Sequence, residues 1–454
     1  MRIWKLSYSP LVLPIIFFAA LILIGSVLLH GAENDSAKPL SWTDAVFTST
    51  SAACVTGLVV VDTGTGFTLL GQIVILLLIQ IGGLGIMTFA SLTLYLWRQK
   101  VSFTDRIAVG QSLRHDPSFH LGKFLTRLAA WTFIIEFLGA ALLFMQAPDR
   151  FSPFSALFHA VSAFCNAGFS LFANSLVNWQ GDWRVNMLFM VLIFLGGIGF
   201  SVLVELQTYF AKLLRPGRNI PGAKLSWHSK TVLQTSLYLI VFGWATIYLA
   251  EFVGYHRMMI ADDAVLTALF QSVTCRTAGF NTIDIARMTN VSLVIMLFLM
   301  FIGGAPGSCA GGLKVTTFRV LTAVIGSQLS GRRQASIGRF GISDDIIRKA
   351  LLLFVFAGVI IFVSSLLLDV TEGGDLPHQQ VRGQFLEILF ETVSAFSTVG
   401  LSTGLTAKLT TAGKWILIIL MFIGRLGPLL FAAAIQSWQK TQFYSLPEAN
   451  LMIG

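Results

Sequence analysis

The stretch AVFTSTSAACVTGL, residues 45–58, decides the fold because close copies of it recur three more times along the chain. The copies read LFHAVSAFCNAGF at 157–169, LFQSVTCRTAGF at 269–280 and LFETVSAFSTVGL at 389–401. Each contains a phenylalanine, then serines, threonines and small residues, then a glycine followed by a large apolar residue. A unit that recurs at a long period indicates a fold assembled from repeats.

The glycines that end these stretches are almost evenly spaced. They are Gly57, Gly168, Gly279 and Gly400, at intervals of 111, 111 and 121 residues. A second glycine motif follows each of them and reads IGGLG from 81, LGGIG from 195, IGGAP from 302 and IGRLG from 423. Two landmarks that recur together predict four repeats, which we place at 1–100, 101–215, 216–335 and 336–454.

The composition requires that lipid solvates much of this chain. Only 12% of the 454 residues are charged and the mean hydropathy is +0.76, whereas about 25% of the residues of a soluble domain are charged. Charge-free stretches long enough to cross a bilayer core of roughly 30 Å as helices occupy residues 10–29, 66–97, 185–204, 231–250 and 350–368. We interpret the first as a retained helix rather than a signal peptide, because no small-residue cleavage site follows it.

The segment before each of these four glycines is about a dozen residues long and rich in serine and threonine. It is therefore too short and too polar to span the membrane. Irregular backbone at membrane depth is tolerated only where it is buried in protein or lines a water-filled cavity. We therefore predict an all-α integral membrane fold with eight transmembrane helices and four re-entrant pore loops around a pseudo-fourfold pore. Only the third repeat is expected to have a broken final helix.

The formal net charge is +9. The charged residues are distributed along the chain as in a membrane protein rather than as in a nucleic-acid-binding protein. Basic residues gather within 98–127, 212–230 and 319–349, and the intervening loops carry most of the acids. This pattern obeys the positive-inside rule. It predicts a multi-pass membrane protein with both termini in the cytoplasm, and it puts all four glycine loops on the outer side.

Four parallel loops in one chain can close a ring whose backbone carbonyls replace the hydration shell of a cation. Glycine adopts positive φ at little cost and so lets neighbouring carbonyls turn toward the axis, while the preceding short helix points its partly negative end at the cavity. The predicted ion filter consists of Val55, Thr56, Gly57, Asn166, Ala167, Gly168, Thr277, Ala278, Gly279, Thr398, Val399 and Gly400.

The helix after the third loop is interrupted by five glycines and a proline, which break helices. We predict that this irregular segment lines a cavity, with a packing kink as the alternative. Its residues are Gly303, Gly304, Ala305, Pro306, Gly307, Ser308, Cys309, Ala310, Gly311 and Gly312.

Three cationic side chains occur near these motifs. Arg425 replaces the glycine found in the first three repeats; its charge can oppose cation passage, or it can hydrogen-bond loop carbonyls, and both roles are compatible. Lys314 follows this glycine-rich segment and can face the pore or snorkel to the surface. Arg276 is expected to point behind the filter and to brace it, because a cation in the filter would repel the transported ion.

The acids on the outer side, Asp44, Asp62, Asp262 and Glu391, can concentrate cations, or each can be a solvated or hydrogen-bonded acid. The four cysteines are expected to be small apolar packing residues. The seven histidines show no metal-ligand spacing, and no nucleophile–base group or phosphate-binding loop is present, so we expect neither an enzyme nor a transition-metal site.

These motifs resemble those of the Trk/Ktr/HKT superfamily of potassium transporters. The matching filter loops are residues 55–58, 166–169, 276–280 and 397–401, and the resemblance covers nearly the whole chain. Because no extra hydrophobic hairpin precedes the first repeat, the chain is more similar to the Ktr membrane subunit than to the longer Trk membrane subunit.

The resemblance implies potassium translocation by a homodimer with one pore in each protomer. It also implies a cytoplasmic ring of nucleotide-binding regulatory subunits of the RCK type, and a mobile gate at the glycine-rich loop near Arg425. A serine in place of the first filter glycine accompanies sodium transport in plant relatives, so Gly57 favours potassium. No cofactor is expected to be bound by this chain. Sodium as an activator, and a sodium- or proton-coupled carrier, stay open as alternatives.

Overall fold

The computed structural model describes residues 13–32, 39–100, 121–214, 224–252, 261–373, 377, 381 and 383–438. A long helix, a short helix, a turn and a further helical segment follow one another four times. The first long helices are α2 (Leu13–His30), α6 (Leu121–Gln146), α10 (Trp227–Phe252) and α14 (Asp344–Glu372). The short helices are α3 (Trp42–Ala53), α7 (Pro153–Phe164), α11 (Ala261–Thr274) and α15 (Gln384–Phe396).

The final helical segment differs among the four units. It is one helix in the first and fourth, α4 (Leu69–Lys100) and α16 (Thr411–Trp438). It is divided into α8 (Trp183–Gly197) and α9 (Phe200–Leu214) in the second unit, and into α12 (Asn290–Phe301) and α13 (Val315–Leu329) in the third. Three short 3-10 helices, η1 (Val177–Trp179), η2 (Ile285–Arg287) and η3 (Thr406–Lys408), and the strands β1 (Ser336–Ile337) and β2 (Phe340–Gly341) complete the described elements.

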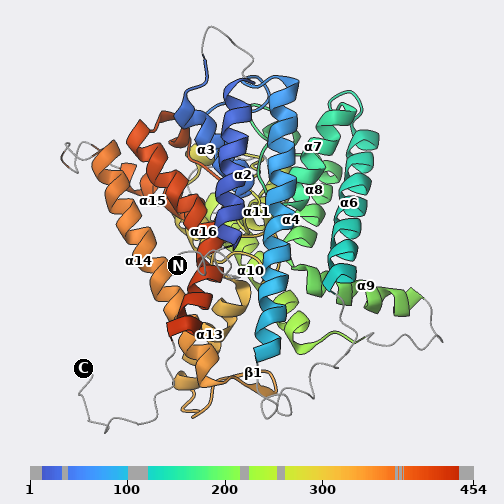
Figure 1. Ribbon diagram of the computed structural model, residues 1–454, viewed down its shortest axis with the longest axis vertical. Helices are drawn as coiled ribbons and strands as arrows, with labels where there is room; N and C mark the ends of the chain where they lie inside the picture. The colour runs from blue at the N-terminus through green and yellow to red at the C-terminus, as the bar shows by residue number, and fades with distance from the viewer. Residues whose placement is uncertain are drawn as a thin grey trace, which may run out of the picture.

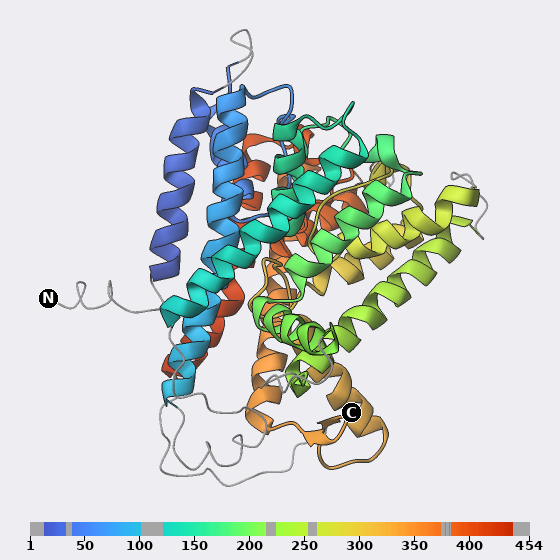
Figure 2. The ribbon, with the colours of Figure 1, turned by 90° about the vertical axis from the view of Figure 1, so that its right-hand side faces the viewer.

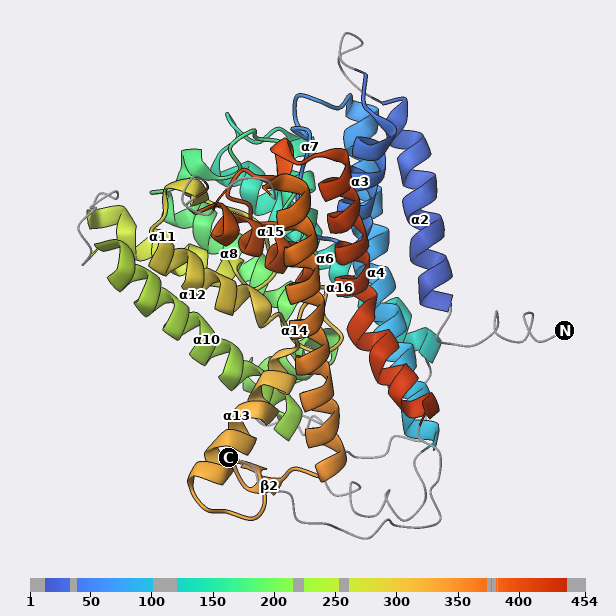
Figure 3. The same cartoon turned by 90° about the vertical axis from the view of Figure 1, so that its left-hand side faces the viewer.

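The four short helices lie toward one end of the molecule. Figures 1 and 3 show α3, α7, α11 and α15 in the upper half, while α13 and the antiparallel β1–β2 hairpin lie at the lower end. Figure 2 shows the same hairpin at the bottom from the other side. The sequence analysis did not predict this hairpin, whose apolar residue Ile337 packs with Val320 of α13 and Ala350 of α14.

Five helices in the described part of the chain are long and apolar enough to cross a membrane, and six if the bent pair α8–α9 counts as one span. Their outward faces carry large apolar side chains, such as Phe137 at 69% exposure and Phe362 at 64%. Such faces are suited to lipid. The chain is therefore a multi-pass membrane protein, although its termini, for which the charge pattern predicts a cytoplasmic position, lie outside the described residues.

The expectation that only the third repeat is broken is wrong, and so is that of a continuous helix over 185–204. The axes of α8 and α9 differ by 113°, and Figure 1 shows α9 lying across the direction of the long helices. The break falls at Gly199, whose φ of +85° no right-handed helix can include. The backbone amide of Phe200 donates to the carbonyl of Gly307 in the third unit, 3.2 Å away, so tertiary contact replaces a helical hydrogen bond.

The apolar core does not separate the four units into domains. The largest buried cluster joins residues of the first, third and fourth units, among them Phe47, Met300 and Phe396. A second joins the first and second units through residues such as Val55 and Phe164. The units therefore fold as one body around a shared centre.

Local sequence signals fix where the short helices begin. Ser41 precedes α3 and its hydroxyl accepts from the amide of Asp44 at 3.1 Å. Ser152 does the same for Ser155 at 3.2 Å before α7, where Pro153 occupies the first turn. Serine at the N-cap and proline in the first turn are preferred because the first amides of a helix have no partner within it.

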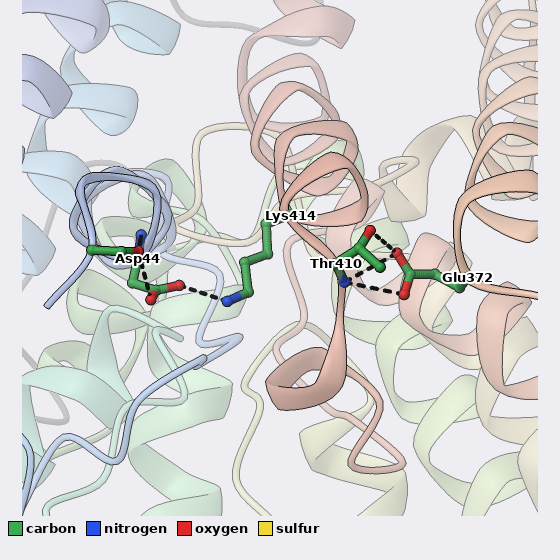
Figure 4. Close-up of polar contacts among 5 residues, drawn as sticks. Asp44, Glu372, Thr410 and Lys414 are labelled. Carbon is green, nitrogen blue, oxygen red and sulfur yellow. Dashed lines mark hydrogen bonds and ion pairs between the residues drawn. The ribbon is translucent and has the colours of Figure 1, made fainter. Parts of the chain in front are cut away.

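Glutamates at the ends of α10 and α14 perform the same capping task across helices. Thr289 precedes α12, and its amide and hydroxyl both donate to Glu251, at 3.0 and 2.9 Å. Thr410 precedes α16, and its hydroxyl donates to Glu372 at 2.7 Å (Figure 4). An acid is favourable at a helix N-terminus, so each glutamate ties the first long helix of its unit to the last helical segment.

The first and fourth units, which are far apart in the sequence, contact each other directly. At this seam the ammonium of Lys414 on α16 lies 2.7 Å from a carboxylate oxygen of Asp44 on α3 (Figure 4). The two side chains are 17% and 18% exposed. This ion pair joins a short helix of one end of the chain to a long helix of the other.

We predict that Asp44→Asn and Lys414→Met each lower the stability of the purified protein by about 1 kcal/mol, because each leaves a half-buried charge unpaired. The exchange variant Asp44→Lys with Lys414→Asp should recover part of the loss. The apparent melting temperature in detergent measures this. Arg287→Gln, which breaks the exposed pair with Asp284, serves as the control and should change nothing. An equal shift in the control would contradict a special role for the seam.

Candidate functional site: a ring of four glycine loops and a loop across it

The four spaced glycines meet at one place and form a closed ring. A methyl group added to Gly57 would overlap the carbonyl oxygen of Ala167 and lie 3.0 Å from Cα of Gly168. One on Gly168 would lie 3.0 Å from Cα of Gly279, and one on Gly279 would lie 3.3 Å from Cα of Gly400. One on Gly400 would lie 2.9 Å from Cα of Gly57. The loops thus follow one another around an axis in chain order, and no ring position has room for a side chain.

Each loop has positive φ at its glycine and at the residue two before it. The non-glycine residues are Val55 at 56°, Asn166 at 59°, Thr277 at 70° and Thr398 at 49°. The ring glycines lie between 71° and 94°. Left-handed backbone is unfavourable for residues with a side chain, most of all for β-branched ones, and it persists only where the surroundings impose it. Because four equivalent residues share this conformation, the surrounding protein must impose it, which is typical of a functional site.

Hydroxyl groups of the short helices hold these loops. The amide of Gly57 donates to Oγ of Ser51 at 3.1 Å, and that of Gly400 donates to Oγ of Ser394 at 3.1 Å. In the second unit Ser162 donates its hydroxyl to the carbonyl of Phe169 at 2.8 Å. In the third, Thr274 donates to the carbonyl of Phe280 at 2.6 Å. The serines and threonines that made these segments too polar to span are therefore the braces of the loops.

Three threonine hydroxyls next to the ring glycines are buried without a hydrogen-bond partner in the described part of the chain. They belong to Thr56, Thr277 and Thr398. Buried polar atoms without partners are uncommon and call for an explanation. Oxygen atoms are the ligands that hard cations prefer, so these hydroxyls, together with the loop carbonyls, suit a cation that sheds its water.

The second glycine motif lets the last helical segment of a unit approach its short helix. A methyl group on Gly82, Gly196 or Gly424 would overlap the carbonyl oxygen of Ala53, Phe164 or Phe396, which ends the short helix of the same unit. In the third unit Gly303 meets the carbonyl of Gly311 instead. The same landmark thus packs against a helix end three times and against the glycine-rich loop once.

The loop 303–312 leaves the helical path and returns to it at nearly the same point. Ile302 and Leu313 form a parallel bridge, and the amide of Gly303 donates to the carbonyl of Leu313 at 2.9 Å. Inside the loop, the hydroxyl of Ser308 donates to the carbonyl of Ala305 at 2.6 Å. Few hydrogen bonds within the loop itself hold its shape, so its contacts with the rest of the protein matter.

Those contacts reach all three other units. The amides of Ala305 and Cys309 donate to the carbonyls of Gly197 and Gly196 at the end of α8, at 2.9 and 3.3 Å. A methyl group on Gly311 would overlap the hydroxyl of Thr398 in the fourth glycine loop. One on Gly83 of the first unit would lie 3.5 Å from Sγ of Cys309. The loop therefore lies across the centre, directly against the ring on the side of the second glycine motif.

Arg425 of α16 is 4% exposed and points at this loop. Its Nη1 donates to the carbonyl of Cys309, and its Nη2 donates to the carbonyl of Gly82 at 3.4 Å. No carboxylate of the described residues forms a salt bridge with it. The prediction that it hydrogen-bonds loop carbonyls is confirmed, and it connects the fourth unit to the first and third.

The other two cations also bond to carbonyls. Nζ of Lys314 donates to the carbonyl of Ala310 at 2.6 Å, so this side chain folds back on the loop. Nη1 and Nη2 of Arg276 donate to the carbonyls of Ser236, at 2.9 Å, and of Gly303, at 3.4 Å. Arg276 thus braces the third glycine loop against its neighbours through hydrogen bonds, as expected.

The acids predicted to gather cations are mostly engaged elsewhere. Asp44 pairs with Lys414, and Asp62 accepts from the amide and hydroxyl of Thr65, both at 2.7 Å. Glu391 is fully buried and accepts from Thr406 at 2.6 Å. The side chain of Asp262 lies outside the described residues. The three acids that are described are therefore hydrogen-bonded or ion-paired, as the second interpretation predicted.

Sequence reasoning missed one buried acid next to the site. Glu136 lies in the middle of the apolar helix α6 at 1% exposure. The thiol of Cys165, the residue that follows α7, donates to its carboxylate at 3.6 Å. A lone acid inside an apolar stretch is a signal of function, and reading α6 by that rule would have found it. All four cysteines are buried and unpaired, as expected of packing residues.

The chain is similar to known cation transport proteins. The family TrkH, described as a cation transport protein, matches residues 15–441. Ktr system potassium uptake protein B of Bacillus subtilis is 40% identical over 99% of this chain and 98% of its own. Potassium/sodium uptake protein NtpJ of Enterococcus hirae is 33% identical over 96% and 95%. The crystal structure of the potassium transporter TrkH from Vibrio parahaemolyticus has the same fold, with a TM-score of 0.67 at 21% identity over 93% of this chain and 85% of that one.

We predict that Gly168→Ala lowers the stability of the purified protein by about 1–2 kcal/mol, because φ of +71° disfavours a side chain and the methyl group has no room. Thermal unfolding in detergent measures the loss. The control is Gly358→Ala in α14, where an added methyl group meets nothing within 4 Å; there stability should stay the same or rise. Equal behaviour of the two variants would show that the ring is not closely packed.

Proposed function

Because the chain belongs to the TrkH family of cation transport proteins, we propose that it takes up potassium through a pore that the four glycine loops surround. The observation that carries the proposal is the closed ring of Gly57, Gly168, Gly279 and Gly400 with positive φ on alternate residues. The relatives from Bacillus subtilis and Enterococcus hirae are named for potassium or potassium and sodium uptake, which supports the choice of ion.

The proposed filter works by exchange of oxygen ligands. A potassium ion that enters the ring loses water and is bound by loop carbonyls and by hydroxyls such as that of Thr398. The braces from Ser51 and Ser394 hold the carbonyls at a distance that suits potassium and keep them from closing around the smaller sodium ion. Potassium is the cargo here, and the chain is not proposed to hold a cofactor of its own.

We propose that residues 303–312 and Arg425 form the gate. The loop lies against the filter, and the guanidinium is directed at its Cys309 carbonyl. A cation that leaves the filter would meet both the loop backbone and a buried positive charge. Displacing the loop breaks its hydrogen bonds to the end of α8, to Phe200 and to the side chains of Arg276 and Arg425. Each contributes about 1–3 kcal/mol, so a regulatory force has to supply that energy to open the path.

The proposed assembly is a homodimer in the bacterial inner membrane, with both termini in the cytoplasm and with the eight spanning helices and four re-entrant loops predicted from the repeats. A ring of nucleotide-binding regulatory subunits would dock at the end that carries α13 and the β1–β2 hairpin. The basic residues Arg332 and Arg333 beside this hairpin support such docking to an acidic partner. A second candidate is a carrier that couples potassium to sodium, which the name of the Enterococcus hirae relative favours.

The function is tested by rescue of a bacterium that lacks potassium uptake. The wild-type chain, expressed with a regulatory subunit, should restore growth at low potassium. Gly57→Ser should lower the ratio of potassium to sodium uptake roughly tenfold, because the added side chain displaces the Ala167 carbonyl. Gly31→Ser, where an added methyl group meets nothing within 4 Å, is the control. An unchanged ratio in Gly57→Ser would refute the assignment of this loop to the filter.

Arg425→Ala should raise the rate of potassium uptake roughly threefold or more, because removal of a buried charge and of its bond to Cys309 lowers the barrier by at least about 0.7 kcal/mol. Rubidium uptake into proteoliposomes at equal protein amount measures the rate. Arg425→Lys keeps the charge and serves as the matched control, with a rate near that of the wild type. If removing the charge left the rate unchanged, Arg425 would be a structural brace alone.

A further inference from the structure

Two short helices carry an acceptor at the same place relative to the ring. His159 of α7 and Glu391 of α15 each lie nine residues before the ring glycine of their unit. Both are fully buried, at 0% exposure. Neither belongs to the filter or to the gate. Each faces the residues that leave the ring, 169–172 in the second unit and 401–404 in the fourth, which we call the exit limbs.

Glu391 holds the fourth exit limb from behind. Its Oε1 accepts from the hydroxyl of Ser402 and from the amide of Thr403, the latter at 3.2 Å. Its Oε2 accepts from the hydroxyl of Thr406 at 2.6 Å. Three donors of one short segment thus converge on one carboxylate. A buried carboxylate needs such donors, and the donors in turn need it, because neither has water to replace the other.

His159 holds the second exit limb in the same way. Its Nε2 accepts from the amide of Leu171 at 3.3 Å and lies 3.0 Å from Oγ of Ser170. Its Nδ1 lies 2.7 Å from the carbonyl oxygen of Ser155. An amide can only donate and a carbonyl can only accept, so the proton is on Nδ1 and the lone pair is on Nε2. The neutral ring therefore presents an acceptor at the place where Glu391 presents Oε1.

The match extends to the limbs themselves. Ser170 and Ser402 both stand two residues after the ring glycine, and the next amide, of Leu171 or Thr403, is the second donor. Each serine oxygen also accepts from the amide two residues on, at 3.0 Å in the second unit and 2.9 Å in the fourth. A histidine and a glutamate thus complete the same four-group arrangement in two units.

The other two units lack this arrangement. Thr48 occupies the matching position of α3, and its hydroxyl has no hydrogen-bond partner among the described residues. In α11 the position nine residues before the ring glycine is Phe270, and the next residue, Gln271, only donates, to the hydroxyl of Thr282 at 3.4 Å. Because the units follow one another in chain order around the ring, the second and fourth face each other across it. The two held limbs are therefore diagonal.

We propose that Glu391 and His159 are positioning residues that fix the two diagonal exit limbs and thereby set how strictly the pore discriminates potassium from sodium. The inference rests on the proposed function. Discrimination requires that carbonyls resist closing on a smaller ion. The exit limb continues directly from the ring glycine, so an anchored limb limits the movement of the glycine carbonyl, whereas a loose one lets it follow the sodium ion.

The test compares uptake of potassium and sodium into proteoliposomes that contain the full-length chain. Glu391→Leu should lower the potassium-to-sodium ratio roughly tenfold, because three buried donors lose their acceptor. Ser402→Ala, which removes one donor and leaves the helix intact, should lower it roughly threefold. Glu391→Gln keeps an oxygen for Ser402 and Thr403 and should stay within about twofold of the wild type. Thr48→Val removes a hydroxyl without a partner and is the matched control.

The second unit supplies an independent arm. His159→Leu should lower the ratio as Glu391→Leu does, and His159→Gln should restore most of it, since a glutamine oxygen can reach the place of Nε2. A residue that only stabilises the fold would reduce the amount of protein and the maximal rate, and would leave the ratio unchanged. The ratio is therefore the readout, measured per molecule of reconstituted protein.

An unchanged ratio in Glu391→Leu and His159→Leu would overturn the inference while the proposed function stands. Where a leucine variant does not reach the membrane, Ser402→Ala and Ser170→Ala decide in its place, and an unchanged ratio in both overturns it equally. A fall in Thr48→Val as large as that in Ser402→Ala would also overturn it, because any change in a short helix would then have the same effect. Absence of potassium uptake by the wild-type chain would instead refute the proposed function, and the inference with it.

Discussion

The contact between four glycine backbones at the centre is the constraint on which the rest of the structure depends. A methyl group on any of Gly57, Gly168, Gly279 or Gly400 would meet the backbone of the next unit at 3.0 Å or less. Backbones approach so closely only if the segments on either side are held rigidly. The hydroxyl braces, the capped short helices and the close packing of the second glycine motif against the helix ends provide that support. The strained φ values of the loops persist because these neighbours impose them.

The departures from fourfold symmetry lie on one side of this ring. The third unit opens its last helical segment into the loop 303–312, and the second unit breaks its own at Gly199 to receive it. The carbonyls that a continuous α8–α9 helix would have used internally accept from the amides of the loop instead. Arg425 then connects the loop to the first unit. A single departure from the repeat thus requires matching departures in its neighbours, because buried backbone groups must all find partners.

The sequence predicted much of this and failed at definable places. Repeated motifs and glycine spacing predicted the order of elements, and the short helices and the glycine loops occur at the predicted residues. The break over 198–199 was missed because Gly196, Gly197 and Gly199 read like the equivalent glycines of the first unit, where α4 continues. The role of Asp44 was missed because its partner, Lys414, is almost the whole chain away. The capping roles of Glu251 and Glu372 were missed because their partners, Thr289 and Thr410, each lie 38 residues further along the chain.

What the sequence determined by itself is what depends on local pattern and period. The charge-free stretches require a membrane, the four copies require a repeat, and the glycines require positive φ or close approach. Only the tertiary structure decided how the copies meet. It closed the ring, directed Glu391 inward to the fourth exit limb rather than outward to solvent, and turned Arg425 and Lys314 onto carbonyls of one loop. The physical reason is that the role of a buried polar group depends on its hydrogen-bond partner. These partners come from segments that contact each other only in the folded chain.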